Sequence, residues 1–349
     1  MAEHKLLAIV GADTLLGREL RDVLTEAGLG ARIRAIAAGE EEPAEPIGEV
    51  EEEEPAPEEE NEELEEAEEL FLESIEDEAY AEAAALLLAG SPASSHRNLE
   101  IAAARGIKVI DLTGALEDQP SARLRAPSLE EPAHQRETEL SVIAHPAASA
   151  LARFYRAVHS VQPIHASVVT VFEPASERGQ AGLDELHQQT VRLLSFQSLP
   201  KHVFDAQIGF NVLSEYGEEA PLPLASIEQR IERCLATLLT WGAAPPPMPS
   251  LRLIQAPVFH GYSFSLWVEF ESVPDLTRLI RGLEAAGVDV RSGIAEPPTN
   301  AGAAGQSGIT VGSIGTDHNR RNAVWFWTVA DNLRLTADHA LEVVREILA

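Results

Sequence analysis

Leu6-Leu-Ala-Ile-Val-Gly11-Ala-Asp-Thr-Leu-Leu-Gly17 is the segment of this 349-residue chain that most clearly indicates its fold. Its first part, Leu6–Val10, is an apolar run with the length of a buried strand. A glycine turn from Gly11 to Gly17 follows, then an amphipathic helix predicted at Arg18–Ala27 and a short strand at Ile33–Ala37. A strand, a glycine turn, a helix and a strand in this order open a doubly wound α/β domain. We therefore expect a parallel sheet at the N-terminus.

The alternation of strands and helices continues beyond residue 80. A strand is predicted at Ala83–Leu88, a helix around Asn98–Ala104, and further strands at Gly106–Asp111 and Leu140–Ala144. Parallel strands with right-handed crossovers account for this order, as in a Rossmann-like domain.

From Ile164 onward the predicted strands are longer and more amphipathic. They lie at His165–Phe172, Leu251–Val258, Ser263–Glu271 and Ala323–Val329, with helices at Leu183–Leu194, Ala225–Leu239 and Pro274–Ala286 between them. This arrangement indicates an α+β domain with a largely antiparallel or mixed sheet. We expect a Rossmann-like domain at 1–148, an α+β domain at 149–328, and a C-terminal segment, 329–349, whose helix packs back on the first domain.

Composition and charge restrict the possible functions. The formal net charge is −31, and residues 40–78 hold 22 of the 57 acidic residues without any Lys or Arg. Such a surface repels phosphates, so nucleic-acid binding is not expected. The part 39–69 cannot bury enough apolar surface to offset its ordering entropy, and we expect a disordered insertion. Alternatively, segment 40–78 docks on a basic partner by charge steering.

The remaining composition predicts a soluble protein of a reducing compartment. Cys234 is the only cysteine, so no disulfide forms within the chain, which agrees with the cytoplasm. No apolar run approaches the roughly 18 residues of a membrane span. The eleven histidines show no metal-ligand spacing, and no metal is expected.

Several short motifs follow one another in a recognisable order. They are Ile9–Gly17, Leu88–Ser94 followed by Gly106–Asp111, Val169–Glu173 leading to Gly179–Leu186, Phe210–Leu213, Ala256–Gly261 and Asp331–Arg334. Together they resemble the motifs of the aspartate-semialdehyde dehydrogenase family. The resemblance covers nearly the whole chain outside residues 39–69. It implies a dinucleotide-binding domain, a catalytic domain that also forms a dimer, and an oxidoreductase ancestry.

The family's functional positions hold different residues in this chain. The nucleophilic cysteine of the family falls on Ala148, its glutamine on Glu173 and its substrate-binding arginine on Gln255. Its general-base histidine falls on Tyr262 and its phosphate-binding arginine on Glu117. An alanine cannot form the covalent intermediate on which the family's reaction depends. No catalytic residue of the family is therefore intact.

Other residues near these positions could have replaced the lost groups. Ser149 follows Ala148, but a serine at the start of a helix is typically a cap. Glu173 and Tyr262 could act as an acid and base pair, or they could be polar filling of an abandoned pocket. His145 could be a new base or a hydrogen-bonded cleft histidine.

The cofactor turn is also altered. Gly11 and Gly17 keep the tight turn and the helix packing, whereas Thr14 stands where the family has its middle glycine, beside Leu15. By resemblance, Asn332 also belongs to the cofactor site. Thr14 would crowd a dinucleotide pyrophosphate unless the turn is remodelled. Acidic residues 40–42 follow the predicted second strand and would repel the 2′-phosphate of NADP, so NADP is disfavoured while NAD stays possible.

Three functions remain open. The first is a catalytically inactive homodimer with a binding or regulatory role. The second is an NAD(P)-dependent oxidoreductase that acts on an aldehyde with altered catalytic residues. The third is an interaction module that uses the acidic segment. The alternation of apolar with small or polar residues in Ser263–Glu271 suits a sheet with one covered face, as a dimer would provide.

Overall fold

The computed structural model describes residues 5–37, 82–131, 138–242, 244–293 and 295–349. The predicted acidic insertion 39–69 and the acidic segment 40–78 lie outside the described residues.

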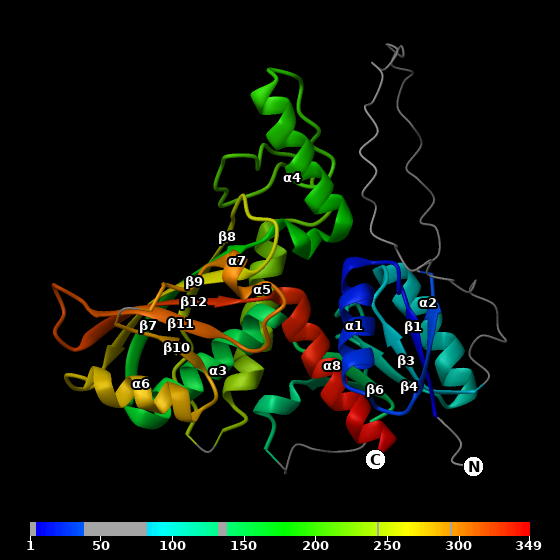
Figure 1. The fold of residues 1–349 in the computed structure, drawn as a ribbon, viewed down its shortest axis with the longest axis horizontal. Coiled ribbons are helices and arrows are strands. Elements are labelled where there is room, and N and C mark those ends of the chain that lie inside the picture. Colours follow the sequence, from blue (N-terminus) through cyan, green and yellow to red (C-terminus); the bar gives the residue numbers. More distant parts are fainter. Residues whose placement is uncertain (1–4, 38–81, 132–137, 243, 294) are drawn as a thin grey trace.

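The first domain is built on a six-stranded parallel sheet in the order β2-β1-β3-β4-β6-β5. Its strands are β1 (Leu6–Val10), β2 (Arg32–Ile36), β3 (Ala83–Leu88), β4 (Lys108–Asp111), β5 (Ala122–Arg125) and β6 (Leu140–Ile143). Helices α1 (Leu15–Glu26) and α2 (Pro92–Arg105) lie beside the sheet (Figure 1). The predicted doubly wound fold is confirmed.

The glycine turn is shorter than predicted, because α1 begins at Leu15 rather than at Arg18. Thr14 is the helix cap: its hydroxyl accepts a hydrogen bond from the Gly17 amide at 3.0 Å. The amphipathic pattern alone does not reveal this first turn, since a cap acts on backbone amides rather than through apolar periodicity.

The second domain is built on a six-stranded mixed sheet in the order β10-β11-β12-β9-β7-β8. Its strands are β7 (Ile164–Glu173), β8 (Ser250–Gln255), β9 (Tyr262–Phe270), β10 (Asp289–Arg291), β11 (Thr310–Thr316) and β12 (Ala323–Ala330). The central pairs β7–β9, β9–β12 and β11–β12 are antiparallel, whereas β7–β8 and β10–β11 are parallel. The predicted α+β character is confirmed.

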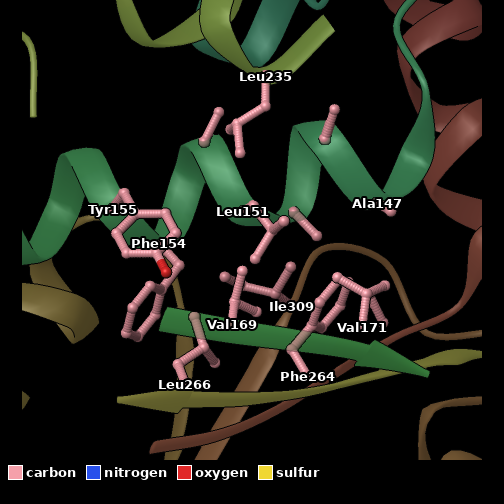
Figure 2. Close-up of a cluster of buried hydrophobic side chains, with 14 of the residues drawn as sticks. Ala147, Leu151, Phe154, Tyr155, Val169, Val171, Leu235, Phe264, Leu266 and Ile309 are labelled. Atoms are coloured by element: carbon pink, nitrogen blue, oxygen red, sulfur yellow. The ribbon is translucent and has the colours of Figure 1, made fainter. Parts of the chain in front are cut away.

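Helices gather on one face of this second sheet. They are α3 (Pro146–Val161), α5 (Leu224–Leu239) and α6 (Leu276–Ala285), while α4 (Gly179–Leu194) projects away from the sheet and α7 (Asn300–Ala303) is a single turn (Figure 1). Figure 2 shows Leu151, Phe154 and Tyr155 of α3 against Val169 and Leu266 of the sheet. Helix α3, which was not predicted, thus carries the largest hydrophobic core.

The C-terminal helix α8 (Asn332–Leu348) returns to the first domain and packs along α1. The Arg334 guanidinium contacts Glu19 at 3.3 Å and Glu26 at 3.2 Å, both on α1. Near the C-terminal end of the helix, Glu346 contacts the buried Arg125 of β5 at 2.7 Å. These contacts hold the start of α8 beside the carboxyl end of the first sheet, where the cavity described below opens.

In the part of the chain that the structure describes, no helix is long and apolar enough to cross a membrane.

Candidate functional site

A cavity of about 630 Å³ lies where the two domains meet. Its wall combines the start of α1, the segments after β3 and β6, the 3-10 helix η4 (Ala175–Arg178), one side of α5 and the start of α8. Carboxyl ends of parallel strands are where doubly wound folds bind ligands. The cavity is therefore the candidate site.

The dinucleotide turn forms one end of this cavity. Gly11 has φ +84°, and a Cβ at this position would stand 2.5 Å from the Gly90 nitrogen, so only glycine fits. The Thr14 hydroxyl lies 2.8 Å from the carbonyl oxygens of both Gly11 and Ala89, which share its single proton. Thr14 and Leu15 both line the cavity. The Thr14 hydroxyl thus ties the turn to the neighbouring strand.

Asn332 stands at the junction between this turn and the second domain. Its side-chain oxygen accepts hydrogen bonds from the Gly261 amide at 3.1 Å and the Ser176 hydroxyl at 3.2 Å. Its side-chain nitrogen donates to Glu177 at 2.8 Å. Asn332 lines the cavity, but its polar atoms hold the cavity wall together.

Ala148 and Ser149 belong to the buried first turn of α3. Ala148 is 0% exposed and packs within the core cluster of the second domain. The Ser149 hydroxyl donates to the His145 carbonyl oxygen at 3.2 Å, one helical turn earlier. Ser149 therefore makes a local helix contact and is not presented to the cavity.

The side chain of Gln255 forms its hydrogen bonds with neighbouring residues of the protein. Its side-chain oxygen accepts from the Tyr216 hydroxyl at 2.6 Å, and its nitrogen donates to the carbonyl oxygens of Glu173 and Ala256 at 3.0 and 2.9 Å. It is 0% exposed. All its hydrogen-bonding groups are used, so no group remains to bind a substrate.

Glu173, at the end of β7, pairs with Arg178 of η4. One carboxylate oxygen accepts from the Arg178 guanidinium at 2.9 Å, and the other has no hydrogen-bond partner among the described residues. Burial raises the pKa of Glu173 to about 7, although the Arg178 charge opposes the shift. Glu173 is therefore only partly ionised at neutral pH.

Tyr262 lies beneath this pair at the start of β9. It is 0% exposed, and its hydroxyl has no well-formed hydrogen bond within the described part of the chain. Burial, then the charges of Glu177 and Glu173, hold its pKa well above the ordinary value of 10.0. A phenol in this state stays protonated and cannot act as a base near neutral pH.

His145 and Glu177 bring titratable groups to the cavity wall. The His145 Nδ1 atom accepts from the Ala147 amide at 3.3 Å, which caps α3, and its Nε2 atom lies 3.8 Å from a Glu177 carboxylate oxygen. Burial, with the charges of Arg230 and Arg178, holds the pKa of His145 well below its ordinary value. His145 is thus a neutral imidazole, and its Nε2–H faces Glu177. Burial raises the pKa of Glu177.

Glu117 is neutralised by an arginine from another element. Its carboxylate accepts from Arg230 Nε on α5 at 2.7 Å. Arg230 lines the cavity, whereas Glu117 does not. The anion-binding position that the sequence shows as lost therefore has a cation beside it, supplied by α5.

Cys234 lies one turn further along α5, near the backbone of His145. It is buried, and burial raises the pKa of its thiol to about 12. A protonated thiol without access to the cavity cannot act as a nucleophile on a ligand bound there. Among the described residues, no group of three metal-ligating side chains occurs either.

The structure thus separates the predicted site residues into two sets. Gly11 and Gly17 shape the turn, and Thr14, Leu15, His145 and Asn332 line the cavity, while Glu117, Ala148, Glu173, Gln255 and Tyr262 lie behind its wall. Sequence reasoning missed Glu177, Arg178 and Arg230 as cavity residues. A signal existed for two of them: Glu177 and Arg178 lie in the short segment between the predicted strand that ends at Phe172 and the motif that begins at Gly179.

Two family profiles match this architecture. The profile described as semialdehyde dehydrogenase, NAD binding domain, covers residues 7–150, and the one described as semialdehyde dehydrogenase, dimerisation domain, covers residues 157–335. A USG-1 protein homolog of Pseudomonas aeruginosa is 31% identical over 272 residues, spanning 73% of this chain and 75% of that protein. Aspartate-semialdehyde dehydrogenase 2 of Vibrio cholerae is 25% identical over 260 residues, spanning 71% and 74%.

Solved structures agree with these matches. A probable aspartate-semialdehyde dehydrogenase from Pseudomonas aeruginosa has a TM-score of 0.77 at 27% identity, over 99% of this chain and 98% of that one. Aspartate semialdehyde dehydrogenase II of Vibrio cholerae, complexed with ASA, has a TM-score of 0.78 at 22% identity over the same shares and supports the fold alone. Since both family domains are matched in order, the chain belongs to the semialdehyde dehydrogenase family.

Proposed function

We propose that this protein does not catalyse phosphorylating aldehyde oxidation and instead serves as a cytoplasmic homodimer that binds a small molecule in the cavity between its domains. One observation carries this proposal. Ala148, Glu173, Gln255 and Tyr262 occupy the family's catalytic positions, yet none of them belongs to the described cavity wall. Each is 0% exposed.

The chemical properties of the residues at these positions also argue against the family's reaction. The family's reaction needs a thiolate to attack the aldehyde and a base to assist it. Ala148 offers a methyl group, and burial keeps the Tyr262 phenol protonated. Cys234 is a buried, protonated thiol on another helix. The loss of a nucleophile and base that act together removes about six orders of magnitude in rate in enzymes where this has been measured.

The dinucleotide end of the cavity retains groups that suit a diphosphate. The amides of Leu15 and Leu16 lie in the first turn of a twelve-residue helix, where backbone N–H groups and the helix dipole favour an anion. Gly11 keeps the turn close to Gly90. These residues would hold the pyrophosphate of NAD, a cofactor that accepts or donates hydride when bound; NADP remains disfavoured by acidic residues 40–42.

A turnover assay combined with a binding assay tests the proposal. Purified protein is incubated with aspartate semialdehyde, phosphate and NAD or NADP, and a catalytically active family enzyme serves as the positive control. We expect no nucleotide reduction above background, and we expect native mass spectrometry to detect a retained small molecule or added NAD. Turnover near that of the active enzyme would overturn the proposal.

The uncovered face of the second sheet supports the homodimer. Val168, Trp267 and Trp325 stand side by side on β7, β9 and β12. Val168 is 48% and Trp325 is 45% exposed, although both lie mid-strand. Asp317 accepts hydrogen bonds from both indole nitrogens, at 3.0 and 2.9 Å, which orients the two rings. An ordered aromatic patch on the family's dimerisation domain suits contact with a second copy.

His145 and Glu177 favour a second candidate, an NAD(P)-dependent oxidoreductase with altered catalytic residues. Both line the cavity, and their Nε2 and Oε2 atoms are 3.8 Å apart. A neutral imidazole beside a carboxyl group with a raised pKa could exchange a proton with an aldehyde or alcohol oxygen. Phosphate-independent oxidation of aldehydes with NAD, abolished by His145→Ala, would support this candidate over the binding role.

A further inference from the structure

Arg178 stands between two buried carboxyl groups and also faces the cavity. One of its terminal nitrogens donates to Glu173 at 2.9 Å, and its charge acts on both Glu173 and Glu177. Its Nε atom is buried and has no hydrogen-bond partner in the described part of the chain. Arg178 lines the cavity, so the guanidinium is both a structural ion-pair partner and a group within reach of a ligand.

Unpartnered polar atoms gather at this point. Seven buried side-chain atoms among the described residues make no hydrogen bond of good geometry. Three of them are Glu173 Oε2, Arg178 Nε and the Tyr262 hydroxyl, the last of which still interacts with Glu177. The charges of Glu173 and Arg178 both act on Tyr262, so the three groups are neighbours. Buried polar atoms in native proteins are nearly always paired, so a cluster of exceptions beside a cavity is a place where a polar ligand or a water molecule can bind.

The charge balance of this region depends on one proton. Two arginines, Arg178 and Arg230, act on His145, while Glu117, Glu173 and Glu177 surround them. With all three carboxyl groups ionised the cluster is net negative and repels an anion. Protonation of Glu173 makes it neutral and leaves Arg178 without its ionised partner. Tyr216 and Tyr262, the other titratable groups that interact with Glu173, stay protonated because burial raises the pKa of both.

We propose that Arg178, assisted by Arg230, binds an oxyanion group of the cavity's ligand, and that this binding takes up one proton at Glu173. The inference rests on the proposed role of the cavity as a binding site. The ligand's carboxylate or phosphate takes the place of the ionised Glu173 as the counter-ion of Arg178. The Glu173 carboxyl group gains its proton from solvent, so one anion and one proton enter together and the net charge of the site is unchanged.

The direction of the pH dependence follows from this exchange. In the protein without ligand, the pKa of Glu173 is about 7. The charge of Arg178 keeps this pKa below the value that burial alone would give. An anion on Arg178 weakens this influence, so the pKa of Glu173 rises further when the ligand binds. Affinity is therefore expected to change little at acidic pH and to fall by roughly tenfold per pH unit above neutrality.

Titration of the full chain with succinate and with inorganic phosphate, as two separate probes, tests the proposal. Isothermal titration calorimetry in two buffers of different ionisation enthalpy measures both affinity and proton uptake. We expect at least one probe to bind with uptake of up to one proton. If neither probe binds at high millimolar concentration, the oxyanion site is wrong; if a probe binds without proton uptake and without pH dependence, the coupling to Glu173 is wrong.

Three variants test which residues are responsible for anion binding and for proton uptake. Glu173→Gln is expected to retain binding and to lose both the proton uptake and the fall in affinity above neutrality. Arg178→Met is expected to abolish probe binding, whereas Arg233→Met, an exposed arginine on the Arg230 helix, leaves it unchanged. If Arg178→Met alone does not fold, the Glu173→Gln/Arg178→Met double variant removes the buried pair together and must also fail to bind.

The turnover assay is measured separately on the same wild-type protein. Aldehyde turnover would contradict the proposed function while leaving the oxyanion site testable. Probe binding that survives loss of Arg178 would contradict only the role of Arg178 in anion binding.

Discussion

At the scale of single residues, Glu173 links burial to the pH dependence of stability. Its pKa is about 7 in the folded protein, against an ordinary value of 4.5 that applies once the chain unfolds. Between these two values the folded state binds more protons than the unfolded state. The free energy of unfolding therefore falls as pH rises through this window, and the loss is complete above it.

The substitution Glu173→Gln removes the titrating carboxyl group and should reduce the dependence of the free energy of unfolding on pH. The wild-type protein is expected to lose on the order of 1–3 kcal/mol between about pH 5 and pH 8 through this residue, and the variant is expected not to. Urea unfolding across this pH range measures the difference, with Glu100→Gln on the exposed side of α2 as the control. Parallel stability curves for wild type and Glu173→Gln would show that Glu173 is ionised throughout.

A substitution at Ala148 tests the proposed inactivity at a single position. Ala148→Cys restores a thiol at the family's nucleophile position, but this position is 0% exposed within the core. We expect the added thiol, like Cys234, to resist Ellman's reagent in the native state and to react only after denaturation. We also expect no aldehyde turnover. A native-state reaction of one extra thiol together with turnover would argue that the site is still assembled.

At the scale of elements, α4 organises the segment that follows it through two buried polar side chains. The Glu185 carboxylate accepts from the amides of Val203 and Phe204 at 2.7 and 3.3 Å. One turn later, the Gln189 side-chain oxygen accepts from the amides of Ile208 and Gly209 at 2.8 and 3.0 Å. These bonds satisfy backbone groups of an irregular segment that has no sheet partner to do so.

Gln189→Ala should therefore release this segment. Loss of several buried hydrogen bonds is expected to cost about 2–4 kcal/mol in the free energy of unfolding. Hydrogen exchange is expected to accelerate at the Ile208 and Gly209 amides, whose acceptor is removed. Gln188→Ala, exposed on the same helix, is the matched control. Equal exchange in both variants would mean that the backbone of this segment holds itself in place.

The helices and strands also differ in how well their sequence predicts them. Strand β3 has the predicted ends, Ala83–Leu88, because its apolar run begins after Glu82 and gives way to the Gly90-Ser91 turn. Helix α3 was missed although its sequence is amphipathic: ten of its sixteen residues are buried, and Arg153, Arg156 and Ser160 recur at helical spacing on the less buried side. Strand β11, Thr310–Thr316, was missed because its glycines weaken the strand pattern.

At the scale of the whole molecule, the exposed aromatic face of the second sheet should determine the oligomeric state. Trp325→Glu places a charge in the ladder formed with Trp267 and Val168. We expect light scattering after size exclusion to show a dimer for the wild-type protein and a monomer for this variant, because a buried unpaired charge costs several kcal/mol. Arg97→Glu, exposed on α2 of the other domain, should stay dimeric. A monomeric wild-type protein would contradict the proposed homodimer.

The sequence alone predicted the two-domain fold class and most of the order of strands and helices, although it missed α3 and β11. It also predicts that the family's catalytic positions hold other residues in this chain. These properties follow from local apolar periodicity and from residue identity at matched motifs. Only the tertiary structure decided that Glu173, Gln255 and Tyr262 lie behind the cavity wall, and that Arg230 reaches Glu117 across 113 positions. Burial and charge proximity set these outcomes, and both arise from contacts between segments that are distant in the chain.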